Sequence, residues 1–357
     1  MLLAAGGTGG HLTPALAVAA ELEDRGARIA FVTTPAQAGL PPDRWAVRTL
    51  DMRGFERRLT ARSNLTTLRL LAAAAPRALG ILRELRPDAV VGGGGFASGP
   101  VVALAGARGT PAVALEADAR LGVTNRLLRP FVDRLCLSFP IAGLEPPKFV
   151  VTGRPLAAAQ VAATRAEGLA AFDLRDDLPG VVVFGGSQGA QSLNRACVDA
   201  FSGELPLQLV HVCGPRNHDE VKAQLERRGA RFERYRLVPY TPLLAQAMAA
   251  ADLVVARSGG SVAEIAALGR PAILVPYPHA TADHQRRNAE WMAAGGAALV
   301  VDDAALSGAL LGRLVAELLG DDERRARMAA ASRRLGRPDA TQRVADTIEA
   351  LMETKGR

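Results

Sequence analysis

Cysteine is scarce in this sequence, with only three among 357 residues. Cys136, Cys197 and Cys213 lie far apart, and no pair of them has the spacing of a zinc site. The scarcity argues against a disulfide-stabilised extracellular fold and favours a reducing compartment. The sequence therefore predicts neither a metal centre nor a bound cofactor.

Long apolar runs are also missing. The longest uncharged stretch, residues 89–107, carries five glycines ahead of Pro100, which indicates a strand, a loop and a helix rather than a membrane span. The first residues run into a glycine loop without a basic region before them, so we expect no signal peptide. The remaining composition, 49% apolar and 22% charged, is that of an ordinary globular protein long enough for two domains.

Negative charge is scarce in one segment. Residues 53–86 hold eight arginines against Glu56 and Glu84, and this excess equals that of the whole first half of the chain. A basic segment suits an anionic membrane surface or a nucleic acid, and the low aromatic content, 4%, favours the membrane because stacking surfaces need aromatic rings. We expect no nucleic acid partner and a peripheral position at the membrane, with Leu79 and Leu82 among the leucines that face lipid. A solvated arginine-rich face is the alternative.

Short β-rich runs alternate with helical stretches along the whole chain. This alternation predicts an α/β fold with parallel sheets covered by helices, arranged as two Rossmann-like, doubly wound domains facing a cleft. We place the domains at residues 1–153 and 154–335. The helical stretch 336–357 has no strand of its own and is a candidate to pack back on the first domain. The predicted strands are Leu2–Ala5, Ala27–Val32, Asp88–Val91, Pro111–Leu115, Arg134–Leu137, Gly180–Phe184, Leu207–Val212, Leu253–Val255 and Pro271–Val275.

Three glycine-rich loops each follow a predicted strand and precede a predicted helix. They are Gly6–His11, Gly92–Pro100 and Gly185–Ala190. Glycine allows close approach of the backbone to a ligand, and a helix start offers free N–H groups, so such loops suit phosphate. None contains the Gly-Lys-Ser/Thr of a nucleotide triphosphatase or a complete dinucleotide fingerprint, which disfavours both of those classes.

Polar residues follow the later strands. Either Ser258 or Ser261 is expected to cap the helix that begins there, and Glu264 lies one turn in, where a carboxylate binds a ribose diol. Asp283, His284 and Gln285 form a polar group suited to sugar hydroxyls.

Two further polar residues stand at predicted strand ends in the first half. His11 follows the first glycine loop and Glu116 ends a strand. Both are candidates for acid–base chemistry, and the sequence does not rank them.

These motifs, in this order, resemble the MurG family, the peptidoglycan N-acetylglucosaminyltransferases. The resemblance rests on Gly6-Gly7-Thr8-Gly9-Gly10-His11, Gly94–Pro100, Gly185–Ala190, Arg257-Ser258-Gly259 with Glu264, and His284-Gln285 with Asn288. It covers nearly the whole chain. It implies a GT-B fold and metal-independent, inverting transfer of N-acetylglucosamine from the UDP sugar to the C4 hydroxyl of the muramyl unit of lipid I, forming lipid II at the cytoplasmic face of the membrane.

The resemblance also implies roles for individual residues. His11 and Glu116 fall on positions important for turnover, and Thr241 falls where the backbone meets uracil. The residues expected to bind the diphosphate of the lipid acceptor are Gly94, Gly95, Phe96 and Ser98. The other sugar-nucleotide positions are Thr8, Gly9, Gly10, Asn125, Ser187, Gln188, Gly259, Gly260, Ser261, Val262, Ala263, Glu264, His284 and Gln285.

The sequence departs from the family pattern at a few places. Ala157 stands where the family often has an arginine that contacts the nucleotide, and Arg154 is the candidate replacement. Phe96 replaces a frequent tyrosine. Three other interpretations stay open: a glycolipid glycosyltransferase, a UDP-N-acetylglucosamine 2-epimerase, and a sugar-nucleotide sensor without catalysis.

Overall fold

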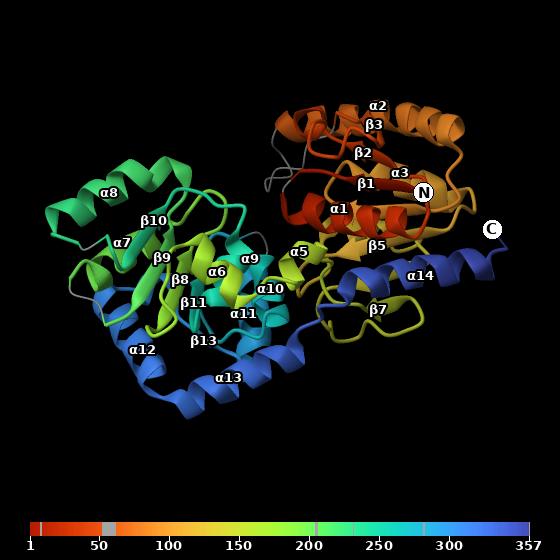
Figure 1. Cartoon of the computed structure of the whole chain (residues 1–357). Helices are drawn as coiled ribbons and strands as arrows, with labels where there is room; N and C mark the ends of the chain where they lie inside the picture. The colour runs from red at the N-terminus through yellow and green to blue at the C-terminus, as the bar shows by residue number, and fades with distance from the viewer. Residues whose placement is uncertain (8, 52–61, 204–205, 231, 281–282, 357) are drawn as a thin grey trace. The chain divides into compact units, whose positions relative to one another are not determined.

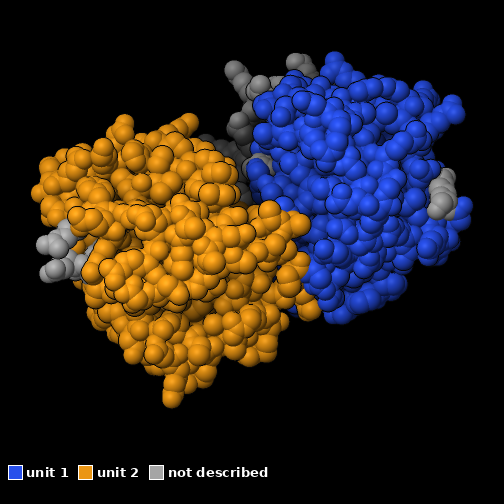
Figure 2. Space-filling view, in the orientation of Figure 1, with its two compact units in different colours: residues 1–157, 339–357 blue, residues 158–338 orange. Residues whose placement is uncertain are grey.

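A computed structural model describes the chain apart from residues 8, 52–61, 204–205, 231, 281–282 and 357, and apart from the side chains of residues 62–73. The chain divides into two compact units (Figure 2). Unit 1 comprises residues 1–157 and 339–357, and unit 2 comprises residues 158–338.

Unit 1 is a seven-stranded parallel sheet with helices on both faces (Figure 1). Its strand order is β3-β2-β1-β4-β5-β6-β7. The strands are β1 (Leu2–Ala5), β2 (Ala30–Thr33), β3 (Ala46–Thr49), β4 (Val90–Gly94), β5 (Ala112–Glu116), β6 (Arg134–Leu137) and β7 (Phe149–Val151). The helices are α1 (Gly9–Asp24), α2 (Arg62–Leu85), α3 (Ser98–Ala107), α4 (Val123–Leu128) and α14 (Ala340–Thr354).

Alternation along the strands builds two cores in unit 1. Leu2 and Ala4 of β1 point to the face covered by α2 and α3, whereas Leu3 and Ala5 point to the face covered by α1 and α14. Burial on both faces explains why central strands such as β1 are apolar throughout. The last helix, α14, packs against α1 through Val344 and its neighbours, so the end of the chain belongs to unit 1.

Unit 2 is a six-stranded parallel sheet in the order β10-β9-β8-β11-β12-β13. Its strands are β8 (Gly180–Phe184), β9 (Gln208–Val212), β10 (Tyr235–Val238), β11 (Leu253–Ala256), β12 (Ala272–Leu274) and β13 (Ala298–Val300). Its helices are α5 (Ala158–Val161), α6 (Arg165–Ala171), α7 (Gln191–Phe201), α8 (His218–Arg227), α9 (Leu244–Ala250), α10 (Ser261–Ala267), α11 (His284–Ala294), α12 (Gly308–Gly320) and α13 (Asp322–Leu335). The predicted α/β class with two Rossmann-like sheets is therefore confirmed.

Two details differ from the sequence prediction. The strand at β4 runs on through Gly94, so Gly92 and Gly93 are buried strand residues rather than a loop. Close packing explains why position 93 is a glycine, because a Cβ built there would lie 2.8 Å from the Cβ of Ala5. Helix α1 begins at Gly9, which places His11 in its first turn.

The basic segment is described only in part. Leu82 packs in the core of unit 1 at 7% exposure, so the expectation that it faces lipid is wrong. Arg77, Arg83 and Arg86 are exposed. The remaining arginine side chains of this segment (53, 57, 58, 62 and 69) lie outside the described residues. Within the described part of the chain, no helix combines the length and the apolar character that crossing a bilayer requires.

Candidate active site

The strand order of unit 1 reverses between β1 and β4. From β1 the chain adds β2 and β3 on one side, and from β4 it adds β5, β6 and β7 on the other. Ligands of doubly wound folds bind at the carboxyl ends of the strands at such a switch point. The loop after β1 and the end of β4 carry the first two glycine motifs, so the topology brings Gly6–His11 and Gly94–Ser98 together.

These two loops touch through backbone atoms. A Cβ built on Gly95, which has φ of +75°, would lie 1.8 Å from the carbonyl oxygen of Gly6. Only glycine fits this approach and this backbone conformation. The hydroxyl of Ser98 is buried and donates to the carbonyl oxygen of Gly95 at 2.9 Å. Ser98 therefore fixes the loop from inside.

His11 lies against the second loop. A Cβ built on Gly94 would lie 2.6 Å from Cδ2 of His11, so the imidazole ring covers a glycine that leaves room for it. The ring is half-buried, at the start of α1. An imidazole at this edge of the sheet can accept a proton from a substrate hydroxyl.

Glu116 ends β5 and is 5% exposed. Its carboxylate accepts hydrogen bonds from three donors: the N–H groups of Asp118 (3.2 Å) and Gly122 (2.8 Å) and Nδ2 of Asn125 (3.0 Å). These bonds hold the turn between β5 and α4. The burial outweighs them and raises the pKa of Glu116 above its ordinary value.

We expect Glu116→Gln to change how stability depends on pH. A carboxyl whose pKa is raised on folding favours the folded state fully below its unfolded pKa, near 4.3, and loses that contribution as pH rises through the folded value. The difference in unfolding free energy between wild type and variant should therefore shrink as the pH rises above about 4. Urea unfolding across this range measures it, and a difference independent of pH would contradict the assignment.

Arg154 has a use that the sequence did not predict. It is 6% exposed, and Nη2 donates to the carbonyl oxygen of Gly10 at 2.7 Å, with Nη1 3.4 Å from that of Ala117. The guanidinium thus joins the first glycine loop to the turn after Glu116, within unit 1.

Asn125 lies in α4, directly after the turn that Glu116 holds. It is buried, with Nδ2 also donating to the carbonyl oxygen of Leu115 at 2.9 Å. Its amide therefore anchors α4 to the end of β5. Thr8, the remaining predicted residue of the first loop, lies outside the described residues.

The sheet of unit 2 has its switch point between β8 and β11. The third glycine loop follows β8, and its tip, Ser187 and Gln188, is exposed. The Arg257–Gly260 turn follows β11 at the same edge. The two motifs therefore lie beside each other where a ligand of this fold binds.

Arg257 connects the segments at this edge of the sheet, a role that the sequence did not predict. It is 7% exposed, and Nη1 lies 2.6 Å from Oδ1 of Asp303 and 3.1 Å from the carbonyl oxygens of Val275 and Pro276. Nη2 donates to Oγ of Ser192, in the first turn of α7, at 2.8 Å. One guanidinium therefore links the segments after β8, β11, β12 and β13. The signal available in the sequence was an arginine directly after an apolar strand, and the structure shows that it is buried.

The start of α11 approaches the turn after β11. Nε2 of Gln285 lies 3.9 Å from a Cβ built on Gly259, and Oε1 of Gln285 accepts from the N–H of Tyr277 at 3.0 Å. Buried Asn288 donates to the carbonyl oxygen of Ser258 at 3.2 Å. The structure thus brings Gln285 and Asn288 next to the predicted turn, and His284 is the first residue of the same helix.

The predicted helix cap is wrong. Gly260 precedes α10, and among the described residues no side chain caps the helix. Ser258 is fully buried, and Ser261 donates to the carbonyl oxygen of Arg257 at 3.4 Å instead. Glu264 lies in the first turn of α10, as the sequence predicts. Thr241 follows β10, where its hydroxyl accepts from the N–H of Leu243 at 3.0 Å.

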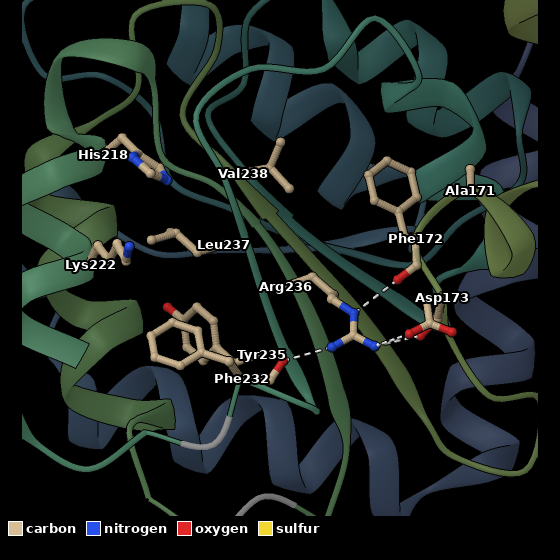
Figure 3. A pocket seen from close by; sticks show the side chains of 10 residues that line it. All are labelled: Ala171, Phe172, Asp173, His218, Lys222, Phe232, Tyr235, Arg236, Leu237 and Val238. Atoms are coloured by element: carbon tan, nitrogen blue, oxygen red, sulfur yellow. Dashed lines mark hydrogen bonds and ion pairs between the residues drawn. The ribbon is translucent and has the colours of Figure 1, made fainter. Parts of the chain in front are cut away.

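A separate pocket of about 540 Å³ lies along the edge strand β10 (Figure 3). Its centre is occupied by Arg236, which donates to the carbonyl oxygen of Phe172 at 3.1 Å and pairs with Asp173 at 2.6 Å. None of the predicted site residues that the structure describes lines it. The pocket is therefore distinct from the strand-end sites.

Comparison with known proteins agrees with this geometry. The family model of the glycosyltransferase family 28 N-terminal domain matches residues 1–136, and that of the C-terminal domain matches residues 180–344. The crystal structure of Acinetobacter baumannii MurG superposes with a TM-score of 0.78 at 28% identity, covering 98% of this chain and 99% of that one. A UDP-GlcNAc 2-epimerase from Neisseria meningitidis, at 14% identity and a TM-score of 0.65 over 98% of this chain and 99% of its own, shares the fold alone.

Fold and strand-end loops together define a GT-B glycosyltransferase with two Rossmann-like halves. Two relatives are named UDP-N-acetylglucosamine–N-acetylmuramyl-(pentapeptide) pyrophosphoryl-undecaprenol N-acetylglucosamine transferase. That of Halothermothrix orenii is 36% identical over 98% of both chains, and that of Halorhodospira halophila is 40% identical over 98% of this chain and 97% of its own. The chain belongs to the MurG family of N-acetylglucosaminyltransferases, and the resemblance seen in the sequence is confirmed.

Proposed function

We propose that this enzyme transfers N-acetylglucosamine from UDP-N-acetylglucosamine to the C4 hydroxyl of the muramyl unit of lipid I, with inversion, giving lipid II. The observation that carries the proposal is the full-length similarity to transferases named for this reaction. The glycine loops at both switch points supply phosphate-binding elements of the kind that a sugar nucleotide and a lipid diphosphate require.

The donor belongs to unit 2 in this proposal. Ser187 and the N–H groups of the loop at 185–190 take the diphosphate charge that grows as UDP leaves. Glu264 binds the ribose diol, and Gln285 and His284 meet sugar hydroxyls. Thr241 and its neighbours meet the uracil. Positioning and charge stabilisation then supply most of the rate increase.

The acceptor belongs to unit 1. The loop from Gly94 to Ser98 holds the lipid diphosphate through backbone N–H groups, because the Ser98 hydroxyl is engaged inside the loop. His11 is the proposed base that removes the proton of the attacking hydroxyl. Glu116 is the less suitable base, because its carboxylate already accepts three hydrogen bonds and orders the turn before α4.

The basic segment 53–86 is the proposed contact with anionic lipid, at the cytoplasmic face of the membrane. We expect the triple change of Arg62, Arg69 and Arg77 to glutamate to weaken binding to anionic vesicles by at least about tenfold, since each basic residue close to an anionic membrane contributes about 1 kcal/mol. Vesicle co-sedimentation measures this. A matched control reverses three exposed arginines of unit 2, which should leave binding within about twofold: Arg227, Arg313 and Arg327. Equal binding by both triple variants and wild type would remove the membrane role.

Product analysis tests the reaction against its alternatives. Incubation with UDP-N-acetylglucosamine alone would give UDP-N-acetylmannosamine from an epimerase and nothing from a sensor. Addition of a short-chain lipid I analogue should give a disaccharide product and UDP. A disaccharide formed only with a different lipid acceptor would instead identify a glycolipid glycosyltransferase.

A further inference from the structure

A line of buried polar side chains runs through the core of unit 2. His211 of β9 is fully buried, Tyr235 of β10 is 1% exposed and Asn194 of α7 is 3% exposed. Nδ1 of His211 lies 2.8 Å from the Tyr235 hydroxyl, and Nε2 lies 3.0 Å from Oδ1 of Asn194. Burying a polar group costs desolvation free energy, which its hydrogen bonds must offset. Apolar residues of similar volume would fill this space without that desolvation cost. The line therefore has a use beyond packing.

The direction of each hydrogen bond in this line is fixed. Nδ2 of Asn194 donates to the carbonyl oxygen of Cys213 at 2.9 Å, so Oδ1 of Asn194 accepts from the imidazole. Nε2 of His211 then carries the proton, and Nδ1 accepts from the Tyr235 hydroxyl. Burial lowers the pKa of His211 to about 3, so the ring stays neutral at physiological pH.

The Cys213 carbonyl is where this line meets the third glycine loop. Nδ2 of Asn217 donates to the same carbonyl at 3.0 Å and to the carbonyl oxygen of Gln188 at 3.1 Å. A Cβ built on Gly189 would lie 1.9 Å from the Cys213 oxygen, so the loop backbone rests on this atom. The Cys213 carbonyl and the Asn217 amide thus contact the loop backbone at Gly189 and Gln188.

We propose that His211 is a positioning residue for the donor diphosphate: through Asn194 it holds the Cys213 carbonyl, and with it the backbone of the loop at 185–190. The inference deepens the proposed function and rests on it. If the loop shifts, its backbone N–H groups make weaker hydrogen bonds to the diphosphate. The uridine part of the donor, in the proposed function, is bound by other residues of unit 2 and should be unaffected.

The test compares affinities for UDP and for uridine by titration calorimetry. The His211→Leu change keeps the core apolar but removes the donor to Asn194. It should lower UDP affinity about tenfold and leave uridine affinity within about twofold of the wild-type value. His211→Gln places an amide N–H near the position of Nε2 and should restore most of the loss. Asn194→Leu, which has no donor for the Cys213 carbonyl, should reproduce the loss and serves as a second variant if His211→Leu does not fold.

Leu225→Ala is the matched control, because Leu225 is a fully buried residue of the same core without a polar contact to the loop. It should lower the melting temperature and leave the ratio of UDP to uridine affinity unchanged. Equal losses of UDP and uridine affinity in His211→Leu, or the same ratio change in Leu225→Ala, would overturn the inference. Wild type that binds uridine and UDP equally weakly would overturn the proposed function itself, so the two failures are distinguishable.

Discussion

Replacing His11 with alanine should lower kcat by roughly 100-fold or more, the usual contribution of a positioned general base. His11 is the imidazole that unit 1 places at its switch point, at the start of α1 and against the second glycine loop. Because the base acts in the transition state, KM for the donor should change little. Steady-state rates with a lipid I analogue measure both constants.

Two companion variants sharpen this prediction. His218→Ala removes a histidine at the start of α8 that has no proposed role, and should retain a near wild-type rate. Gly94→Ala leaves the imidazole intact but places a methyl group 2.6 Å from its ring, and should lower kcat through displacement. A His11→Ala rate within about threefold of wild type would remove His11 from the chemistry.

Replacing Arg257 with alanine should destabilise unit 2 by about 3 kcal/mol and also weaken UDP binding. Removing the guanidinium leaves Asp303 without its buried ion-pair partner. It also releases the segments that the guanidinium joins, among them the start of α7 with Ser192, beside the third glycine loop. Arg257→Lys keeps the charge but not the planar fork, so it should recover part of the stability and less of the binding. Urea unfolding and UDP titration report the two effects.

Arg270 provides the matched control. It is half-buried and donates to backbone carbonyl oxygens, those of Ala251 at 2.9 Å and Ala249 at 2.6 Å, but it precedes β12 and so lies at the opposite edge of the same sheet. Arg270→Ala should therefore lower stability and leave UDP affinity unchanged. If both variants bind UDP like wild type, Arg257 is structural only.

The sequence predicted those parts of the fold that depend on local pattern. Apolar runs such as Gly180–Phe184 and glycine loops after them are visible without a structure, because burial on both faces leaves a continuous apolar run. The edge strands β3, β7, β10 and β13 were missed. They are three or four residues long and half-exposed, so their side chains show no clear period.

Contacts between distant residues were beyond prediction. Nothing near Arg154 indicates that its partner is the carbonyl oxygen of Gly10, and nothing near His211 indicates Asn194. Such pairs depend on which strands are neighbours and on how helices cover them. A polar residue inside an apolar strand, as at His211, was the one available signal.

The most direct test of the account is the initial rate of transfer of radiolabelled N-acetylglucosamine from its UDP derivative to a lipid I analogue, with and without a metal chelator. We predict a β-linked disaccharide product, formed at equal rates in both conditions, because loop N–H groups and helix starts take the diphosphate charge. Loss of transfer in the chelator would contradict the metal-independent mechanism. Absence of labelled disaccharide in both conditions would contradict the proposed reaction.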